Sequence, residues 1–315
     1  MTTADDDTHR AWVGPVGWLC LAVAALFGAL TAIRWIPDDG TFVVAAASGR
    51  WLWGLGTFAT LVMAGLLGHR PAVLGCSLLA AAQLALGTTW PAPASAPPPG
   101  PDQVTVLAVN LEYGQADQHV LADISTRLDV DVLVLTEVTA QSLEAAVANP
   151  RFTHHVGRAS QDASGTVVLS RWPLRPVEPG RSTTFDMPLV DVDTPRGTVR
   201  VRAVHNASPL HPGWQRELAE LAQKPADDMP TVLAGDFNAS RDHAAFRPLL
   251  ASYDDAFDLV GGGWVPTWST RAIPYVRIDH LMVHRLAVVD AGTVRLPDTD
   301  HAGVWARLEP SGVAQ

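Results

Sequence analysis

Acidic and amide side chains stand directly after several apolar runs between residue 103 and the end of the 315-residue chain. They are Asn110, Glu137, Asp236, Asn238 and Asp279. A sheet that brings carboxylates from several strand ends to one edge makes a site for a cation. Both cysteines lie before residue 103, so this part of the chain offers oxygen but no thiol ligands. The pattern predicts a hard cation, Mg²⁺, with Mn²⁺ as the alternative.

Two histidines could supply proton transfer beside these carboxylates. His205 ends the apolar run VRAVH, and His301 follows Asp300 near the C-terminus. Hydrolysis of a phosphate ester needs neutralised phosphoryl oxygens, an aligned water and a proton route to the leaving oxygen. Imidazole suits the last of these because it titrates near neutral pH. The segment GDFN at 235–238, taken alone, also fits a turn in which Asp and Asn cap backbone amides.

The elements that must position these groups are predicted from apolar runs rich in β-branched residues. We expect strands at residues 104–110, 130–135, 166–169, 198–203, 231–234, 278–283 and 303–307. Helical spacing predicts helices at 119–128 and 215–223. Strands and helices in succession over about 215 residues indicate an α/β fold with a sizeable core.

Taken in order, these segments resemble the endonuclease/exonuclease/phosphatase family over nearly all of residues 103–310. The matching segments are Asn110, Thr136-Glu137, Ser170-Arg171-Trp172-Pro173, His205, GDFN, Thr267-Trp268, Ile278-Asp279-His280 and Thr299-Asp300-His301. The fold that the resemblance implies is a four-layer α/β sandwich, in which two packed mixed β-sheets are flanked by helices.

The resemblance also implies a metal side and a catalytic side of one site. On the metal side Glu137 looks like the principal ligand, with Asn110 beside it and Asp300 completing the carboxylates. On the catalytic side the resemblance implies that Asp236 orients the attacking water and that Asn238 stabilises the transition state. His205 assists the leaving group. His301 is also implied to be catalytic, and Asp279 orients it. The resemblance gives Arg171 no assigned role, but contact with a substrate phosphate is one interpretation of its position after a strand.

Several features argue against nucleic acid as the substrate. The chain has a formal net charge of -10, and Lys224 is the only lysine after residue 101. Proteins that wrap nucleic acid use cations to displace condensed counterions. The chain also departs from the DNA-repair branch of the family, with Thr136 in place of Gln, Asn206 in place of Leu, and Ala302-Gly303 in place of Arg-Pro.

The N-terminal part has a different composition. Residues 13–33, 51–68 and 71–90 carry no charge, and each is long enough to cross a bilayer. We therefore predict an anchor of three transmembrane helices in residues 1–90, a Pro-rich linker at 91–102 and a catalytic domain at 103–310. Three aspartates near the N-terminus argue against a cleaved signal peptide. The positive-inside count is tied, but a short turn at His69-Arg70 favours a catalytic domain outside the cell.

Three spans, a proline spacer and the ending TDHAG at 299–303 together resemble an actinobacterial subgroup associated with resistance to teicoplanin-type glycopeptides. That resemblance implies hydrolysis of a lipid-linked phosphate or pyrophosphate, such as undecaprenyl pyrophosphate, by an enzyme that resides in a membrane. A tethered extracellular nuclease or phosphodiesterase is the alternative, and a non-catalytic module that binds anions is a second. The sequence leaves the oligomeric state open.

Overall fold

The computed structural model of the chain describes residues 4–87, 103–178, 183–225, 227–262, 265–269 and 274–310. The chain divides into two compact units, one made of Met1–Trp90 with Asp242–Ala244 and the other of Pro91–Arg241 with Ala245–Gln315. We call them the helical unit and the catalytic unit. The expected Pro-rich linker at 91–102 lies outside the described residues.

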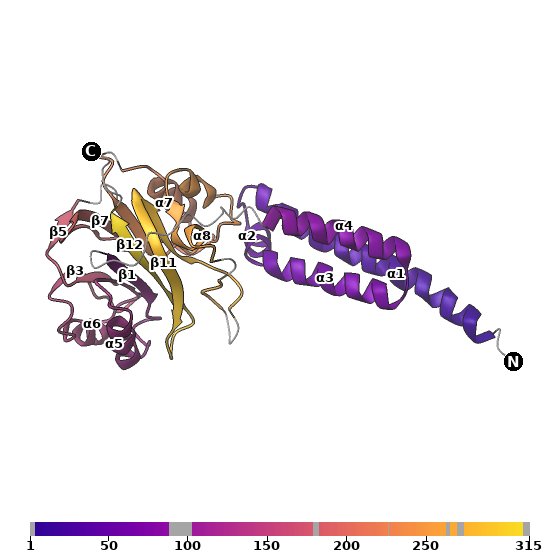
Figure 1. Cartoon of the computed structure of the whole chain (residues 1–315), viewed down its shortest axis with the longest axis horizontal. Coiled ribbons are helices and arrows are strands. Elements are labelled where there is room, and N and C mark those ends of the chain that lie inside the picture. The colour runs from indigo at the N-terminus through magenta and orange to yellow at the C-terminus, as the bar shows by residue number, and fades with distance from the viewer. Residues whose placement is uncertain are drawn as a thin grey trace. The chain divides into compact units, whose positions relative to one another are not determined.

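The helical unit is built from helices that pack side by side (Figure 1). Its elements are α1 Ala4–Ala32, η1 Ile33–Trp35, α2 Thr41–Ser48, α3 Arg50–Leu66 and α4 Arg70–Gly87. Large apolar side chains on α1, α3 and α4 face outward; Leu26 is 56% exposed and Leu66 is 80% exposed. Isolated exposed apolar residues are ordinary, but this many on one bundle indicate an apolar environment or a partner surface.

The prediction of three transmembrane helices is wrong by the criterion of length. Among the described residues, one helix is long and apolar enough to cross a membrane, at Gly14–Trp35. Helix α3 has 17 residues, which is about 26 Å at a rise of 1.5 Å per residue. The apolar part of α4 is Arg70–Ala85, which is shorter still. Helix α3 ends at Leu66, two residues before the end of the predicted span at 51–68, and the last residues of the predicted span at 71–90 lie outside the described residues. Both helices are therefore shorter than the roughly 30 Å of a hydrocarbon core.

The catalytic unit contains two packed mixed β-sheets flanked by helices, which confirms the predicted fold class (Figure 1). The first sheet has the order β11-β12-β1-β2-β4-β3 and the second β5-β6-β7-β8-β10-β9. The strands of the first sheet are β1 Val104–Asn110, β2 Val132–Thr136, β3 His154–Arg158, β4 Thr166–Ser170, β11 Leu286–Arg295 and β12 Ala302–Pro310. Those of the second are β5 Leu174–Val177, β6 Leu189–Thr194, β7 Gly197–His205, β8 Thr231–Asp236, β9 Asp254–Asp255 and β10 Asp279–His284.

The side chains of each central strand alternate between two cores. Val104, Val106 and Ala108 of β1 belong to the core between the sheets, whereas Leu107 and Val109 pack on the helical side. That side is covered by α5 Gln118–Arg127 and α6 Ala140–Val147. The remaining helical elements are α7 Trp214–Leu221, η2 Arg247–Ala251 and α8 Ala256–Leu259. Because both faces of β1 are buried, its sequence is a continuous apolar run.

The strand directions gather the polar strand ends at one edge of the sandwich. β1 runs parallel to β2 with Asn110 opposite Thr136, and β7 runs parallel to β8 with His205 opposite Asp236. β10 is antiparallel to β8, so its first residue, Asp279, also lies opposite Asp236. The C-terminal ends of four strands and the N-terminal end of β10 therefore meet at the same edge.

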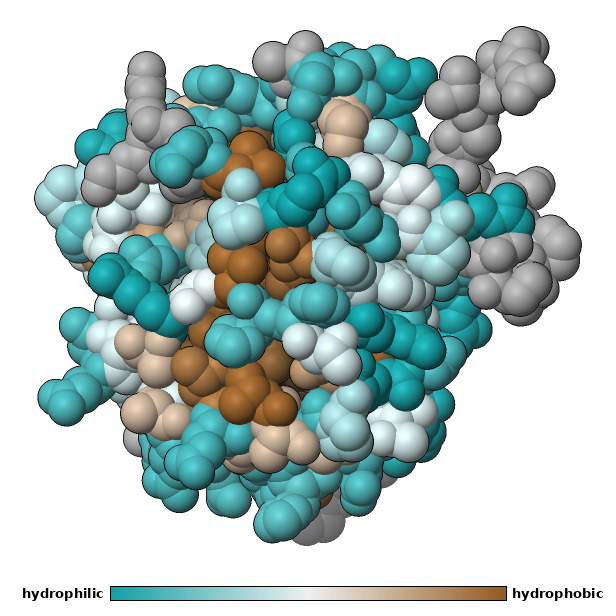
Figure 2. Space-filling view, turned by 90° about the vertical axis from the view of Figure 1, so that its left-hand side faces the viewer, coloured by the Kyte–Doolittle hydropathy of each residue, from teal (hydrophilic) through white to brown (hydrophobic). Residues whose placement is uncertain are grey.

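A different edge of the sandwich is open where β3 and β5 end their sheets. Figure 2 shows the face on this side of the molecule, with a band of apolar side chains bordered by polar ones. The half-buried Val156, Trp172 and Leu174 pack there against the core between the sheets. The band is thus the exposed margin of that core.

Gly235 is a position where the backbone needs glycine. Its φ is 137°, and an added Cβ would lie 2.1 Å from the carbonyl oxygen of Val204 on the neighbouring strand. Gly197 has a similar φ of 115° but no atom within 4 Å of such a Cβ. We expect Gly235→Ala to lower the free energy of unfolding by about 2 kcal/mol more than Gly197→Ala, because only the first adds a clash to the strain. Urea unfolding of both variants would measure this, and equal losses would contradict it.

Candidate active site

The structure brings the predicted site residues to the edge where the strands end. Each follows or precedes a buried strand, so its position is fixed by the sheet and not by a free loop. From the first sheet come Asn110, Glu137, Asp300 and His301, and from the second His205, Asp236, Asn238 and Asp279. The site therefore spans the two sheets.

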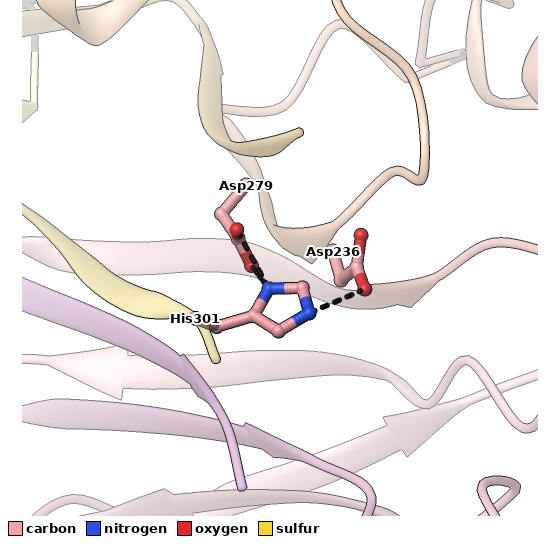
Figure 3. Close-up of side chains that lie close together, drawn as sticks. All are labelled: Asp236, Asp279 and His301. Carbon is pink, nitrogen blue, oxygen red and sulfur yellow. Dashed lines mark hydrogen bonds and ion pairs between the residues drawn. The ribbon is translucent and has the colours of Figure 1, made fainter. Parts of the chain in front are cut away.

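The ring of His301 lies between two buried aspartates (Figure 3). Its Nδ1 is 2.9 Å from one carboxylate oxygen of Asp279 and 3.1 Å from the other. Its Nε2 is 3.8 Å from Oδ2 of Asp236 and 3.7 Å from Oδ1 of Asp300. Nδ1 therefore carries a proton that it donates to Asp279, which fixes the direction of Nε2.

This arrangement makes His301 a cation at neutral pH. Burial by itself lowers the pKa of His301, but the negative charges of Asp279 and Asp236 outweigh it and raise the pKa to about 10. Burial raises the pKa of Asp236 to about 7, against the attraction of His301 and with the repulsion of Asp279. A carboxylate whose pKa lies near neutrality can accept a proton during a reaction at that pH.

Asp236, Asp279 and His301 offer ligand-type atoms that all lie within 4.8 Å of one another. Three such groups could hold a metal ion. Here, however, the imidazole hydrogen-bonds to one aspartate and is charged, and a protonated imidazole has no lone pair for a metal. We therefore interpret this triad as the catalytic part of the site.

Glu137 and Asn110 form a second cluster on the first sheet. Nδ2 of Asn110 donates to Oε1 of Glu137 at 3.0 Å and to Oδ2 of Asp236 at 3.1 Å, so this amide joins the two sheets. Oε2 of Glu137 accepts from the backbone N–H of Tyr113 at 3.0 Å. Oδ1 of Asn110 accepts from the backbone N–H of Glu112 at 2.9 Å. Asn110 thus fixes the positions of the Glu137 and Asp236 carboxylates relative to each other.

Glu112 is a residue that the sequence analysis missed. Its Oε2 accepts from the backbone N–H of Asp300 at 2.6 Å. Burial raises its pKa, the hydrogen bond from Asp300 opposes this, and the charges of Asp300 and Glu137 raise it further. Three carboxylates therefore repel one another here. Glu112 could have been found as an acidic residue two positions after Asn110.

This repulsion is the observation that tests whether the residues fit a divalent cation. Glu112, Glu137 and Asp300 supply only oxygen ligands. Burial is the main cause of the raised pKa of Glu112, and a positive charge nearby would offset the further contribution that comes from the charges of Asp300 and Glu137. Carboxylates of this kind are the ligands that Mg²⁺ and Mn²⁺ take. The chemistry of these side chains therefore suits a hard divalent ion, whereas the three acidic or histidine side chains of the described residues whose ligand atoms lie within 4.8 Å of one another are Asp236, Asp279 and His301.

His205 differs from His301 in charge. Burial lowers its pKa to about 4, and the positive charge of His301 acts in the same direction. Its ring stacks on Phe185 with centroids 4.4 Å apart, and its Nε2 lies 3.8 Å from Oε1 of Glu137. At neutral pH it is therefore an uncharged imidazole facing the carboxylate of Glu137.

Asn238 is held beside Asp236 by three hydrogen bonds. Its backbone N–H donates to Oδ1 of Asp236 at 2.7 Å, and its side-chain amide donates to the carbonyl of Asn206 at 2.9 Å. The indole of Trp214 donates to its carbonyl at 3.1 Å. Its φ of 48° and that of Glu137, 55°, lie in the left-handed region. Such strain in non-glycine residues is common at functional sites.

Thr267 and Trp268 support the catalytic residues. Oγ1 of Thr267 accepts from the backbone N–H groups of Ile278 and Asp279, each at 3.1 Å. Nε1 of Trp268 donates to Oδ2 of Asp300 at 2.9 Å. The sequence analysis placed this pair in the series of motifs without a role, and the structure shows that both residues hold site residues in position through hydrogen bonds.

Arg171 does not contribute to the site. It pairs with Asp131 at 2.7 Å, and Asp131 in turn accepts from the backbone N–H of Thr105. Both contacts lie at the start of β1 and β2, opposite the end where Asn110 stands. The interpretation that Arg171 contacts a substrate phosphate at this site is therefore wrong.

Comparison with protein families identifies the class. Residues 107–301 match the model of the Endonuclease/Exonuclease/phosphatase family, which is more than half of the chain. The chain belongs to this family of phosphoesterase-type hydrolases. No curated protein matches the chain.

Solved structures share the fold. An endonuclease/exonuclease/phosphatase from Beutenbergia cavernae is 22% identical, with a TM-score of 0.55, and the match covers 67% of this chain and 72% of that one. A humanized TDP2 of D. rerio is 15% identical, with a TM-score of 0.52, over 66% and 99% of the two chains. A truncated Caenorhabditis elegans TDP2 is 16% identical, with a TM-score of 0.52, over 65% and 97%. At these identities the likeness is one of fold.

The raised pKa of His301 makes stability depend on pH. Between about pH 6.5 and 10 the folded protein holds a proton on His301 that the unfolded chain has released, so this contribution is full below pH 6.5 and is lost as pH rises to 10. We expect His301→Gln to flatten the decline of the unfolding free energy over pH 7.5–10. Urea unfolding at several pH values would measure the slopes, and parallel slopes in both proteins would contradict the assignment.

Proposed function

We propose that this protein is a divalent-metal-dependent phosphoesterase that hydrolyses a lipid-linked phosphate or pyrophosphate, such as undecaprenyl pyrophosphate, at the outer face of a membrane. The observation that supports catalysis most directly is the imidazole of His301 held between Asp279 and Asp236. It lies beside the Glu137 and Asn110 cluster, so a cationic donor, a basic carboxylate and a set of oxygen ligands share one edge.

Each residue has a distinct part in the hydrolysis. Asp236 accepts a proton from water while the water oxygen bonds to phosphorus and the bond to the leaving oxygen breaks. Protonated His301 donates a hydrogen bond from Nε2 to a phosphoryl oxygen, and Asp279 keeps the ring in that orientation. The amide of Asn238 lies on the same side and can donate to a second phosphoryl oxygen.

Glu137, Glu112 and Asp300 would hold the divalent ion. When bound, such an ion neutralises the charge of the phosphoryl oxygens as the transition state forms. Asn110 orients Glu137 for this task through the hydrogen bond to Oε1. When water attacks the terminal phosphorus of a lipid pyrophosphate, the leaving group is the lipid phosphate, which is a stable anion. Neutral His205 therefore need not transfer a proton to the leaving oxygen and can donate a hydrogen bond to it instead.

The helical unit supports a membrane location. Trp18 and Leu19 of α1, Phe58 and Leu66 of α3, and Leu78 of α4 are among the large apolar residues that are exposed. The stretch Gly14–Trp35 is long enough to span the bilayer. A membrane-bound enzyme meets a membrane-bound substrate at high effective concentration, which favours a lipid phosphate. Glycopeptide antibiotics act on cell-wall lipid intermediates, and a lipid of this kind is the proposed substrate. We therefore also propose a role in resistance to glycopeptide antibiotics.

A tethered nuclease or phosphodiesterase is the second candidate because the fold is shared with TDP2. The net charge of -10 argues against it, since binding to nucleic acid depends on basic groups. A non-catalytic module that binds anions is less compatible with the site, because the acid, the base and the oxygen ligands are all present.

The first test is phosphate release from undecaprenyl pyrophosphate by the full-length protein in detergent with Mg²⁺, with plasmid DNA as the parallel substrate. We expect release from the lipid, a loss on adding EDTA, and a loss of at least about a thousandfold in His301→Ala and in Asp236→Asn. Arg171→Ala is the matched control, because its residue lies at the opposite strand ends. Cleavage of DNA without release from the lipid would establish the nuclease instead, and neither activity would refute both.

A second test concerns the membrane. Leu19→Arg combined with Leu26→Arg places two charges on outward-facing positions of α1, at about 2.5–3.5 kcal/mol each if the helix crosses a bilayer. We expect this variant to be lost from the alkali-washed membrane fraction, in which the unchanged protein remains. Leu210→Arg introduces the same charge at an exposed leucine of the catalytic unit and should leave fractionation unchanged. An unchanged protein that washes off the membrane would contradict the anchor.

A further inference from the structure

A cavity of about 870 Å³, lined by both polar and apolar groups, lies beside the metal side of the site. It is bounded by the loop after β1, from Tyr113 to the start of α5, and by the start of α6, which follows Glu137 by three residues. The backbone N–H of Tyr113 donates to Oε2 of Glu137 at 3.0 Å, so the wall of the cavity touches the candidate metal ligand. A group bound in it would adjoin the phosphate held at the site.

The lining of this cavity is rich in neutral hydrogen-bonding groups. Four of the residues that line it are glutamines, at Gln115, Gln118, Gln141 and Gln161. Hydroxyl groups come from residues 139, 142 and 160, and no lysine or arginine is among the described residues that line it. A carboxamide offers both donors and an acceptor, so it matches a hydroxyl group in either direction.

Tyr113 stands between this cavity and the active site. Its side chain is 55% exposed although its backbone is fixed by Glu137. Glu112, Tyr113 and Gly114 all have positive φ values, of 46°, 54° and 75°. This turn aims the amide of Tyr113 at the site and leaves its ring free on the cavity side, as an apolar platform among polar groups.

Gly114 allows the loop after β1 to pack closely against the first turn of α6, which bounds the other side of the cavity. A Cβ at this position would lie 2.4 Å from Oγ1 of Thr139, so the loop can approach the first turn of α6 only with glycine there. Ser142 accepts the backbone N–H of Thr139 and fixes that turn. Both walls of the cavity are therefore built and held by specific contacts.

We propose that this cavity binds a sugar carried on the terminal phosphate of a lipid pyrophosphate. The water oxygen then bonds to that phosphorus while its bond to the bridging oxygen breaks, which releases a sugar 1-phosphate and leaves the lipid phosphate. The inference rests on the proposed function and deepens it. Glutamine amides and hydroxyls pair with the many hydroxyls of a sugar, and the ring of Tyr113 packs against its apolar C–H face. A second phosphate is a poor occupant because the lining has no cationic side chain apart from His119 when it is protonated.

The volume agrees with such an occupant. Pockets for small molecules span roughly 300–1,000 Å³, and the present cavity lies near the upper end, with room for a sugar with substituents. A nucleobase would have been favoured by a large aromatic or arginine face on both sides for stacking, but Tyr113 and the imidazole of His119 are the aromatic groups of the described lining, which has no Trp, Phe or Arg.

The test compares two substrates of the full-length protein in detergent, undecaprenyl pyrophosphate with and without N-acetylglucosamine on its terminal phosphate. We expect the ratio of kcat/KM, glycosylated over bare, to exceed one and to fall about tenfold in Gln141→Ala combined with Gln161→Ala. Both side chains are exposed, so the variant should keep its melting temperature. Tyr113→Ala should lower the ratio and Tyr113→Phe should not. Gln223→Ala, an exposed glutamine outside the cavity, is the matched control.

Binding separates this inference from the proposed function. N-acetylglucosamine 1-phosphate would be titrated into the protein by calorimetry, with uridine 5′-monophosphate as the comparison. Binding of the sugar phosphate that weakens in the double glutamine variant supports the cavity even if neither lipid is hydrolysed. If both lipids are hydrolysed and the ratio of kcat/KM, glycosylated over bare, is the same in every variant, the inference is overturned and the proposed function still stands. Preferred binding of the nucleotide overturns the sugar assignment.

Discussion

The contact of His301 with Asp279 and Asp236 crosses from one sheet to the other, so the site exists only because the two sheets pack face to face. Asp236 and Asp279 end strands of the second sheet, and His301 precedes β12 of the first. A buried charge without a partner is costly, and the buried imidazole of His301 takes its partners Asp236 and Asp279 from the other sheet. The apolar core between the sheets therefore sets the distance on which the chemistry depends. Asn110 makes the same crossing through its hydrogen bond to Asp236.

The two histidines show how burial and neighbours divide the work of chemically identical side chains. His301 faces two carboxylates, which raise its pKa. Burial lowers the pKa of His205, whose ring stacks on Phe185, and the nearby cation of His301 lowers it further. One is therefore a cation at neutral pH and the other an uncharged imidazole. Together with the repelling carboxylates around Glu112, this gives the edge a positive and a negative half, as a phosphate and a divalent ion would need.

Local sequence patterns were sufficient for most of the buried strands but not for the edges. The strands at 104–110, 166–170 and 231–236 are continuous apolar runs because both their faces are covered, and they were predicted with errors of two residues or fewer. The edge strands β3, β5, β9 and β11 and the short helix α6 were missed, since half-exposed segments with charges and glycine carry little periodicity. The interior strand β6 was missed as well, because Asp191 and Asp193 interrupt its apolar residues. The number of membrane spans was overestimated because the apolar segments of the sequence are longer than the apolar helices that they form.

The sequence by itself determined which chemistry is present, because the order of Asn110, Glu137, the GDFN segment, Asp279 and His301 identified the family and the fold. Composition also separated the helical unit from the catalytic unit. Only the tertiary structure decided the protonation states, the part of Glu112 and the opposite placement of Arg171. These depend on burial and on distances between residues far apart in the chain, which no local pattern encodes. The glutamine-lined cavity likewise arises where the loop at 113–119 meets residues 139–145 and 160–161, segments that adjoin only after the sheet has formed.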